Sequence, residues 1–253
     1  MRVLVTRPEP QAADWVARLR GEGIAAVALP LICIGPAADA AAVQQAWATL
    51  GAQRLAVFVS PNAVEQFMAA RPQGAVWPPG VQAGSPGPGT TQALRRCGVP
   101  GELIVEPAAG SAQFDSEALW QQLRRSDWRG AQVLIVRGDG GREWLADTLR
   151  AHGAQVALLG AYRRSAPRLD AAAQALLRAA LDAPSSHLWL FSSSEAVDNL
   201  AVLAGDAADW SRARALATHP RIAARAQQLG LGQVAQTRPT LAAVSACIQS
   251  MAP

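Results

Sequence analysis

The sequence contains no lysine, so all 23 of its basic side chains are arginines. Without lysine there is no amine for a Schiff base, for attachment of pyridoxal phosphate or for a phosphate-binding P-loop. Arginine stays charged near neutral pH and forks onto carboxylates and phosphates. The composition therefore excludes several cofactor-dependent classes, whereas a GC-rich genome that replaces lysine throughout explains the arginine bias itself.

Cysteine, aromatic residues and long apolar runs are also scarce. Cys33, Cys97 and Cys247 lack CxxC spacing, which favours free thiols in a reducing compartment. Aromatic residues make up 5% of the chain and do not alternate with arginines, so a stacking platform for nucleic acid is not expected. No apolar run reaches the ~18 residues of a membrane span, and the first residues form a strand pattern, unlike a signal peptide. We therefore expect a cytoplasmic protein with no nucleic-acid or membrane partner.

Strand and helix patterns alternate along the whole chain, which predicts parallel sheets covered by helices on both faces. The expected strands are 2–6, 25–29, 55–59, 80–83, 103–105, 133–136, 155–159, 187–191, 213–217 and 233–235. The expected helices are 10–21, 39–50, 62–70, 88–97, 116–125, 142–152, 170–182, 195–204, 220–229 and 240–250. Ser116 and Asp170 are placed to cap two of these helices.

The order of these patterns repeats once. Residues 3–30 align without a gap with residues 133–160, so that Arg7 falls on Arg137. Residues 57–64 resemble residues 190–197 in the same way. The chain is therefore predicted to hold two copies of one βα unit, and ten strands in two copies predict two five-stranded, flavodoxin-like sheets.

Two stretches that contain proline, residues 29–36 and 160–167, occupy equivalent places in the two copies. If both cross between domains, the first domain is discontinuous. It then consists of residues 1–30 and 168–253, the second domain of residues 38–158, and the linkers of residues 31–37 and 159–167. The alternative is a single division of the chain near residues 126–130. Patterning alone leaves both arrangements open.

Residues 138–141 form a glycine-rich turn between the apolar strand pattern 133–136 and a helix pattern. A strand, a glycine turn and a helix N-terminus together form an anion site from backbone N–H groups. Arg137 and Arg142 flank the turn and add positive charge. The alternative is a tight turn with two solvated arginines.

Polar residues also follow most of the other strands, whereas acidic residues are few there, chiefly Asp139 and Glu195. Ligands of doubly wound sheets bind at the C-terminal ends of the strands. Two such edges facing each other would form a cleft of hydroxyls, backbone donors and arginines. The sequence therefore predicts a site for a polyanion.

Seven motifs occur in order along the chain: residues 3–8 (VLVTRP), 58–64 (FVSPNAV), 87–90 (GPGT), 137–142 (RGDGGR), 162–164 (YRR), 191–194 (FSSS) and 217–223 (ATHPRIA). With this order and spacing, the chain resembles the uroporphyrinogen-III synthase family from end to end. The resemblance implies two flavodoxin-like, doubly wound parallel-sheet domains that are joined by a two-stranded linker, the first domain being discontinuous in sequence.

The resemblance also implies a cyclising hydro-lyase that needs no cofactor and no metal. Its substrate is hydroxymethylbilane, a linear tetrapyrrole that carries acetate and propionate groups. The family converts it to uroporphyrinogen III with loss of water and inversion of ring D through a spiro intermediate, in haem, sirohaem and cobalamin biosynthesis. The sequence agrees, because it has no metal-ligand cluster and no GxGxxG spacing after its first strand. Catalysis would then consist largely of holding a flexible chain in the right geometry.

The resemblance places Tyr162, the only tyrosine, near the cleft as a donor to the leaving hydroxyl; the alternative is a linker tyrosine that only packs. His219 departs from the small residue expected in this loop of the family, and at a helix start it should be neutral near pH 7. Surface arginines, helix caps and turn residues are the plainer alternatives for the other positions. The expected substrate-binding residues are Arg7, Ser60, Asn62, Thr90, Arg137, Gly138, Asp139, Gly140, Arg142, Ser192, Ser193, Thr218, His219 and Arg221.

Two other functions fit parts of the pattern. One is a two-domain protein that closes on an anionic ligand without catalysis. The other is a nucleotide-dependent transferase, which the missing P-loop, dinucleotide motif and lysine disfavour. For the synthase, we expect a monomer that binds hydroxymethylbilane and makes transient contact with hydroxymethylbilane synthase.

Overall fold

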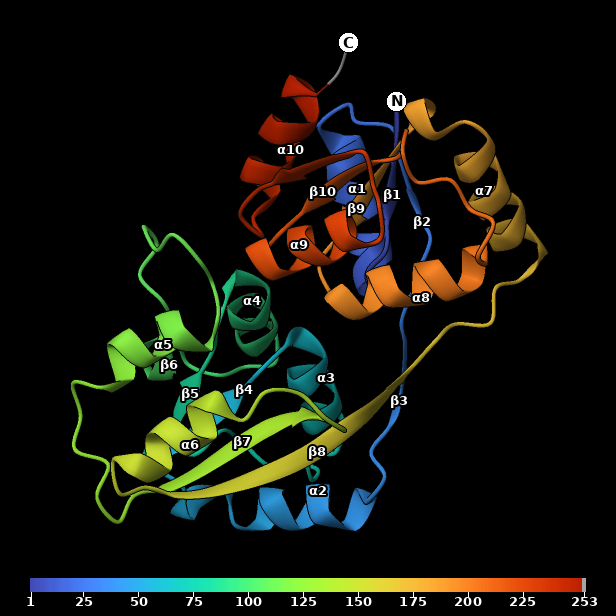
Figure 1. Ribbon diagram of the computed structural model, residues 1–253. Coiled ribbons are helices and arrows are strands. Elements are labelled where there is room, and N and C mark those ends of the chain that lie inside the picture. Colours follow the sequence, from blue (N-terminus) through green and yellow to red (C-terminus); the bar gives the residue numbers. More distant parts are fainter. Residues whose placement is uncertain (252–253) are drawn as a thin grey trace. The chain divides into compact units, whose positions relative to one another are not determined.

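The protein is described here by a computed structural model that covers residues 1–251. The chain divides into two compact units, one of residues 1–34 with the residues from 165 onward, and the other of residues 35–164. Each unit is built on a sheet of mainly parallel strands with helices on both faces (Figure 1). The predicted fold class is confirmed.

The first unit contains a five-stranded sheet in the order β11-β10-β9-β1-β2, with neighbouring strands parallel. Numbered along the chain within the unit and read from the other edge, this is the order 2-1-3-4-5 of flavodoxin-like sheets. The central strands β1 and β9 come from distant parts of the chain, so the two parts of this unit share one sheet. The strands are β1 (Arg2–Val5), β2 (Ala26–Ala28), β9 (His187–Phe191), β10 (Arg214–Ala217) and β11 (Gln233–Gln236).

Both faces of this sheet are buried, because successive residues of each strand point to opposite faces. Val3 and Val5 pack with α1 (Gln11–Gly21) and α10 (Leu241–Ser250). Leu4 packs on the other face, with the core that three further helices cover. These are α7 (Ala171–Asp182), α8 (Ser194–Ala204) and α9 (Pro220–Gln228).

The second unit contains a six-stranded sheet in the order β3-β8-β7-β4-β5-β6. Without β3, it has the same flavodoxin-like order if β7 and β8 are counted first and β4, β5 and β6 after them. The chain enters this unit at a different strand, so the second copy is circularly permuted. The strands are β3 (Cys33–Pro36), β4 (Leu55–Phe58), β5 (Gln82–Gly84), β6 (Ile104–Val105), β7 (Gln132–Gly138) and β8 (Gln155–Ser165).

Helices also cover both faces of the second sheet. On one face, α5 (Ser116–Leu123) and α6 (Trp144–Ala151) pack against inward side chains of β4 and β7. On the other face, Phe67 of α3 (Pro61–Ala69) stacks on Trp47 of α2 (Ala40–Ala48) and contacts Phe58 of β4. α4 (Pro88–Arg96) packs beside α3. Short 3₁₀ turns lie at Leu50–Ala52, Gly101–Leu103 and Pro184–Ser186.

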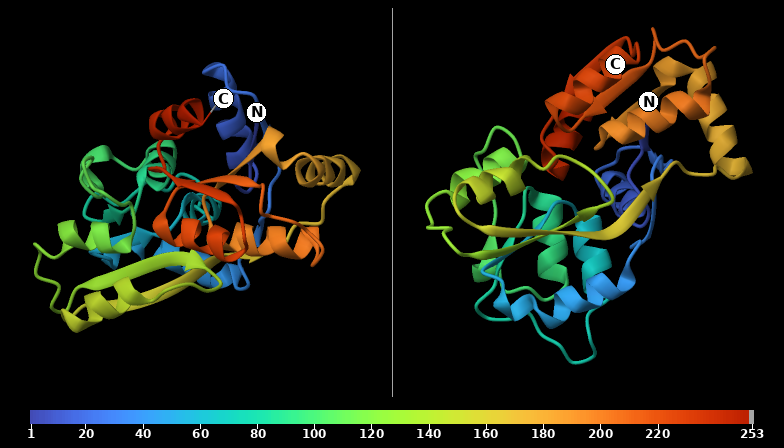
Figure 2. Two further views of the ribbon diagram at one scale, coloured as in Figure 1. Left: turned by 45° about the horizontal axis from the view of Figure 1, so that its top comes forward. Right: turned by 60° about the horizontal axis from the view of Figure 1, so that its bottom comes forward.

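The structure corrects the sequence predictions in three places. The second sheet has six strands instead of five, because residues 33–36 join its edge as β3 beside β8. β8 is also longer than predicted and continues to Ser165 as one strand (Figure 2). Finally, Asp115 rather than Ser116 caps α5, accepting a hydrogen bond from the Ala118 N–H at 2.9 Å. Ser116 is already helical, so the extended residue before it takes the capping position.

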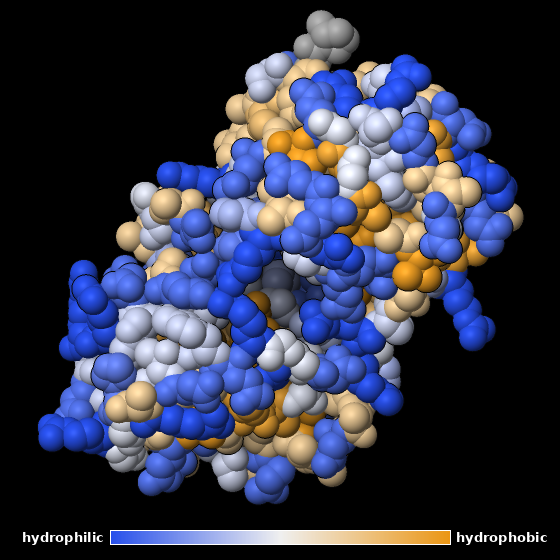
Figure 3. Space-filling model, viewed as in Figure 1, coloured by the Kyte–Doolittle hydropathy of each residue, from blue (hydrophilic) through white to orange (hydrophobic). Residues whose placement is uncertain are grey.

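The face shown in Figure 3 is mostly hydrophilic, with apolar patches between the polar side chains. Among residues 1–251, no helix is long and apolar enough to cross a membrane. Most of the large apolar side chains are buried between the helices and the two sheets, whereas a few, such as Val76, Trp144 and Val202, are exposed.

Candidate functional site

The loop between β7 and α6 is the glycine-rich turn that the sequence singled out. β7 ends at Gly138 and α6 begins at Trp144. Gly140 and Gly141 have φ angles of 157° and 124°, which residues with a side chain rarely adopt. The turn therefore requires glycine at both positions. As a result, no side chain projects from these two residues near the end of β7.

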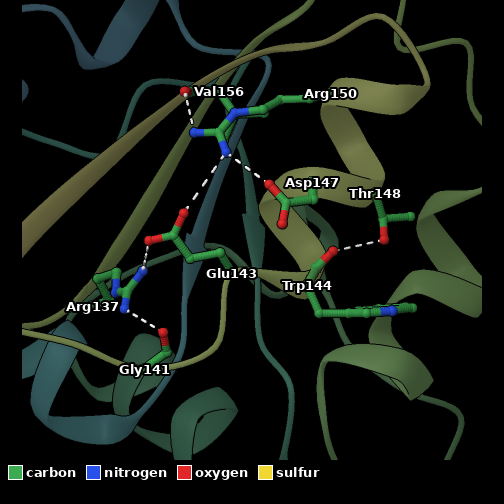
Figure 4. A network of polar contacts seen from close by, with 8 residues as sticks. All are labelled: Arg137, Gly141, Glu143, Trp144, Asp147, Thr148, Arg150 and Val156. Carbon is green, nitrogen blue, oxygen red and sulfur yellow. Dashed lines mark hydrogen bonds and ion pairs between the residues drawn. The ribbon is translucent and has the colours of Figure 1, made fainter.

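Arg137 is buried at the end of β7, and its guanidinium binds the loop that follows. One amino group donates to Glu143 Oε1 at 3.2 Å, and the other donates to the Gly141 carbonyl at 2.8 Å (Figure 4). Glu143 also faces Arg150, with 4.0 Å between the charged atoms. The charge of this predicted ligand arginine is thus balanced within the loop, and its side chain fixes the loop's shape.

Arg142 is likewise paired within the unit. Its two terminal nitrogens donate to the two carboxylate oxygens of Glu117, on α5, at 2.6 and 3.0 Å. This forked hydrogen bonding raises the pKa of Arg142 above its ordinary value. A ligand carboxylate that binds this arginine must share it with Glu117 or displace Glu117.

Tyr162 lies across from Gly138 because the pairing of β7 with β8 is irregular at this point. Arg137 is opposite Gly160, but Gly138 is opposite Tyr162, so one extra residue bulges from β8. Only 4% of Tyr162 is exposed. A Cβ on residue 138 would lie 3.0 Å from the Cε2 and Cζ atoms of the ring. The tyrosine can therefore occupy this place only because residue 138 is glycine.

The hydroxyl of Tyr162 forms a hydrogen bond with Ser60 Oγ at 3.0 Å. Ser60 directly precedes α3 and caps it, because its Oγ accepts a hydrogen bond from the Ala63 N–H at 3.1 Å. Three adjoining segments thus fix the phenol: the end of β7 by packing, β8 through the backbone, and the N-terminus of α3 through Ser60.

A pocket of about 230 Å³ opens beside these groups. Six of the predicted site residues line it: Ser60, Arg137, Gly138, Gly140, Arg142 and Tyr162. The other lining residues are Val59, Ser116, Ile135, Gly141, Glu143, Leu145, Ala146, Leu158 and Arg164. The sequence patterns did not assign Glu143 or Arg164 to the site, although Glu143 directly follows the motif at residues 137–142 and Arg164 is part of the motif at residues 162–164. The pocket combines apolar walls with positive charge and a phenol.

Three predicted residues of the same unit do not line the pocket. Asn62 is in the first turn of α3. Thr90 is buried in the first turn of α4. The Asp139 carboxylate accepts a hydrogen bond from the backbone N–H of Arg164 at 3.4 Å, so it connects the glycine turn to β8.

In the first unit, Arg7 follows β1 at the edge where that sheet's strands end. Its guanidinium lies over the Trp15 ring, 4.6 Å from the ring centre, in a cation–π contact. Removal from water and the nearby charge of Arg18 lower the pKa of Arg7 to about 10. Within the described chain, its buried Nε has no hydrogen-bond partner.

The other predicted residues of the first unit follow β9 and β10 at this same edge. Ser193 caps α8 by accepting from the Glu195 N–H at 3.2 Å. His219 caps α9, its Nδ1 accepting from the backbone N–H of Arg221 at 3.1 Å, so this nitrogen carries no proton. Two further predicted residues sit directly after a strand: Ser192 after β9 and the buried Thr218 after β10.

The side chains at the pocket are not those of a metal centre. Over residues 1–251, no group of three or more His, Cys, Asp or Glu side chains is arranged to hold a metal ion. The donors at the pocket are a phenol, serine hydroxyls, backbone N–H groups and arginines, a set that suits carboxylates better than cations.

A family model described as "Uroporphyrinogen-III synthase HemD" matches residues 13–246. The uroporphyrinogen-III synthase of Escherichia coli K12 is 35% identical over 179 residues, which are 70% of each chain. That of Synechococcus elongatus is 30% identical over 217 residues, 83% of this chain and 77% of the relative.

Two solved structures share the fold. One is a mutant uroporphyrinogen III synthase from the extremely thermophilic bacterium Thermus thermophilus, with a TM-score of 0.57, 17% identity and coverage of 99% of this chain and 96% of the other. The second is uroporphyrinogen-III synthetase from Helicobacter pylori 26695, with a TM-score of 0.56, 15% identity and full coverage of both chains.

Proposed function

Because the chain belongs to the uroporphyrinogen-III synthase family, whose enzymes cyclise a linear tetrapyrrole, we propose that the pocket beside Tyr162 is where its substrate reacts. The observation that carries this proposal is the position of the phenol. It is buried, packed against Gly138, hydrogen-bonded to Ser60 and at the wall of a pocket that arginines also line.

The family implies hydroxymethylbilane as the substrate. We assign to Tyr162 the donation of a proton to the terminal hydroxyl of this molecule, so that the hydroxyl leaves as water. The pyrrole that carried it becomes an azafulvene, which closes the ring through a spiro intermediate and inverts ring D. The apolar walls and the fixed phenol favour this closure over the simple head-to-tail one, because they restrict how the flexible chain can fold.

The acetate and propionate groups of the substrate require positive partners. We propose that Arg142 binds one of them by exchanging its Glu117 contact for the ligand, and that the backbone of Gly140 donates to the same group. Arg137, by contrast, keeps the loop in shape through Glu143 and Gly141.

The remaining predicted residues are also proposed to bind the acidic groups of the substrate. In the second unit these are Asn62, Thr90 and Gly138, whereas the carboxylate of Asp139 is proposed to stabilise positive charge that develops on a pyrrole nitrogen. In the first unit they are Arg7, Ser192, Ser193, Thr218, His219 and Arg221. They share a place after strand ends or at helix N-termini, where hydroxyls, N–H groups and guanidinium groups are available.

We further propose that residues 31–37 and 159–167 act as the linkers between the domains formed by residues 1–30 with 168–253 and by residues 38–158. The protein is proposed to work in the cytoplasm as a monomer and to receive hydroxymethylbilane during transient contact with hydroxymethylbilane synthase. The lability of the substrate, which cyclises without an enzyme, is the chemical reason for such a contact.

A coupled assay tests the function and the role of Tyr162 together. Hydroxymethylbilane is made in place by its synthase, this protein is added, and the products are oxidised and separated as type I and type III uroporphyrin. We expect mostly type III with the parent protein and a fall in kcat of about 100-fold with Tyr162→Phe, since a general acid typically contributes ~10²–10⁴-fold. Type I alone from folded parent protein would overturn the function, whereas full activity of Tyr162→Phe would overturn only the role of the phenol.

A further inference from the structure

Two hydrogen bonds meet at Ser60 Oγ. The backbone N–H of Ala63 donates to it at 3.1 Å, and the hydroxyl of Tyr162 lies 3.0 Å away. These are the contacts of the Ser60 hydroxyl within the described chain. The distance alone does not say which of the two hydroxyls donates to the other, and this direction decides where the proton of Tyr162 points.

The first bond favours donation by Ser60. A hydroxyl has one proton to donate and two lone pairs with which to accept. Ser60 Oγ already accepts from the first turn of α3, where the N–H groups and the helix dipole both present positive charge. An oxygen that accepts such a bond becomes a better donor and a poorer acceptor, because chained hydrogen bonds polarise one another. The oxygen of Tyr162 is the acceptor within reach of the Ser60 proton.

We propose that Ser60 is a positioning residue that donates its hydroxyl proton to the oxygen of Tyr162, which leaves the phenol's own proton directed into the pocket. The inference deepens the proposed function, since it rests on Tyr162 as the group that protonates the leaving hydroxyl. It reassigns Ser60 from contact with the substrate to control of the phenol.

The proton balance of the step follows from this arrangement. The Tyr162 proton moves to the hydroxyl of the substrate, the carbon–oxygen bond breaks with its electron pair on oxygen, and water leaves. The positive charge spreads over the pyrrole, while the phenolate keeps the hydrogen bond from Ser60. When the macrocycle later regains its aromatic pyrroles, the carbon that formed the last bond loses a proton, which restores the phenol. Substrate therefore becomes product and water without another reactant.

The charged groups at the pocket are compatible with a transient phenolate. Arg137, Arg142 and Arg164 line it together with one carboxylate, that of Glu143. Glu143 is held toward Arg137 by the 3.2 Å bond between them. Ser60 thus supplies the direct hydrogen bond to the phenolate, and the carboxylate that lines the pocket is paired with Arg137.

Three substitutions separate donation to Tyr162 from capping of α3. Ser60→Thr keeps both functions. Ser60→Asp keeps the cap, because Asp is as good an N-cap as Ser, but it has no proton to donate and draws the phenol's proton toward itself. Ser60→Ala loses both. Asp39→Ala is the matched control for capping alone, since Asp39 caps α2 of the same unit by accepting from the Ala42 N–H at 2.9 Å and does not line the pocket.

In the coupled assay, we expect Ser60→Thr to retain the parental kcat. For Ser60→Ala, kcat should fall about 3- to 10-fold, which corresponds to the net free energy of one hydrogen bond. For Ser60→Asp, kcat should fall about 100-fold, because the proton of the phenol would point away from the substrate and the contribution of the general acid would be lost. Asp39→Ala should lower the melting temperature and leave kcat unchanged. Parental kcat in Ser60→Asp, or equal kcat losses in Asp39→Ala and Ser60→Ala, would overturn the proposal.

Because Tyr162 is the only tyrosine, Raman spectroscopy gives a second readout that does not require activity. The intensity ratio of the tyrosine Fermi doublet rises when the phenol accepts a hydrogen bond and falls when it donates one. We expect the parent and Ser60→Thr to share a high ratio, and Ser60→Ala and Ser60→Asp to show lower ones. A low ratio in the parent that rises in Ser60→Ala would mean that Tyr162 donates to Ser60. A fully active Tyr162→Phe variant would instead overturn the role of Tyr162 as an acid. The Raman measurement would still determine which hydroxyl donates in the Ser60–Tyr162 hydrogen bond.

Discussion

Replacing Gly138 with alanine is expected to disable the site by moving Tyr162. The new Cβ would lie 3.0 Å from Cε2 and Cζ of the ring, whereas carbon atoms in contact are normally about 3.5–4.0 Å apart. Since the Cβ is fixed to the backbone of β7, the ring must retreat by about 0.5–1 Å. The same movement is expected to weaken or break the 3.0 Å hydrogen bond to Ser60.

A misplacement of about 1 Å can reduce the rate ~10²-fold. We therefore expect kcat to fall about 10- to 100-fold, which corresponds to about 1.4–2.8 kcal/mol in the activation barrier. The overpacking should reduce the free energy of unfolding by only ~1–3 kcal/mol. The effect on the site is thus separable from loss of the fold.

The coupled assay with separation of the type I and type III products measures this fall in kcat directly. Spontaneous closure to type I competes with the enzyme, so the ratio of the two products reports the enzyme's rate. Gly160→Ala is the matched control: Gly160 lies in β8 near the site, and a Cβ there would meet no atom within 4 Å. Parental kcat in Gly138→Ala, with the folded state verified by circular dichroism, would refute the claim that the position of Tyr162 controls the reaction.

Three further predictions concern stability. In Gly232→Ala the new Cβ would lie 1.8 Å from the Ser211 carbonyl oxygen, so urea unfolding should show a loss of about 3 kcal/mol or more. Asp115→Ala removes the α5 cap and should cost about 1 kcal/mol by the same measurement. Hydrogen bonding to Arg129 lowers the pKa of Asp127 from 3.8 to about 2; the contribution is therefore present above pH 3.8 and lost as pH falls toward 2. Asp127→Asn should accordingly lower the melting temperature more at pH 7 than at pH 2, and an equal difference at both would contradict this.

The internal repeat predicted how the strands pair more accurately than the residue patterns predicted where each strand begins and ends. The gapless alignment of residues 3–30 with residues 133–160 requires the two pairs of strands to share one register. They do: Val3 pairs with Ala26 in β1 and β2, and their aligned counterparts Val133 and Val156 pair in β7 and β8. The third strand also keeps its place, because β9 pairs with β1 as β4 pairs with β7. The sequence of a buried strand specifies its register, because a shift of the pairing by one residue would turn the apolar side chains to the opposite face.

The partners of the arginines could not be predicted in this way. Arg137 and Arg142 were recognised as positive groups beside a glycine turn, but their contacts with Glu143 and Glu117 depend on rotamers and on how α5 packs beside the turn. Periodicity describes which face of an element is buried and contains no information about such side-chain pairs. The bulge in β8 is equally invisible to it, although the bulge sets the position of Tyr162.

Just beyond the aligned residues, the two copies differ in the side chains at the end of their paired strands. The same offset aligns Gly138 with Pro8 and Tyr162 with Ile32. In the first unit, Ile32 is part of the buried core. In the second unit, glycine removes the side chain that would occupy the space of an aromatic ring, and the bulge in β8 brings Tyr162 into that space. One repeated backbone therefore carries a core residue in one copy and the proposed acid in the other, and the glycine is as necessary to the difference as the tyrosine.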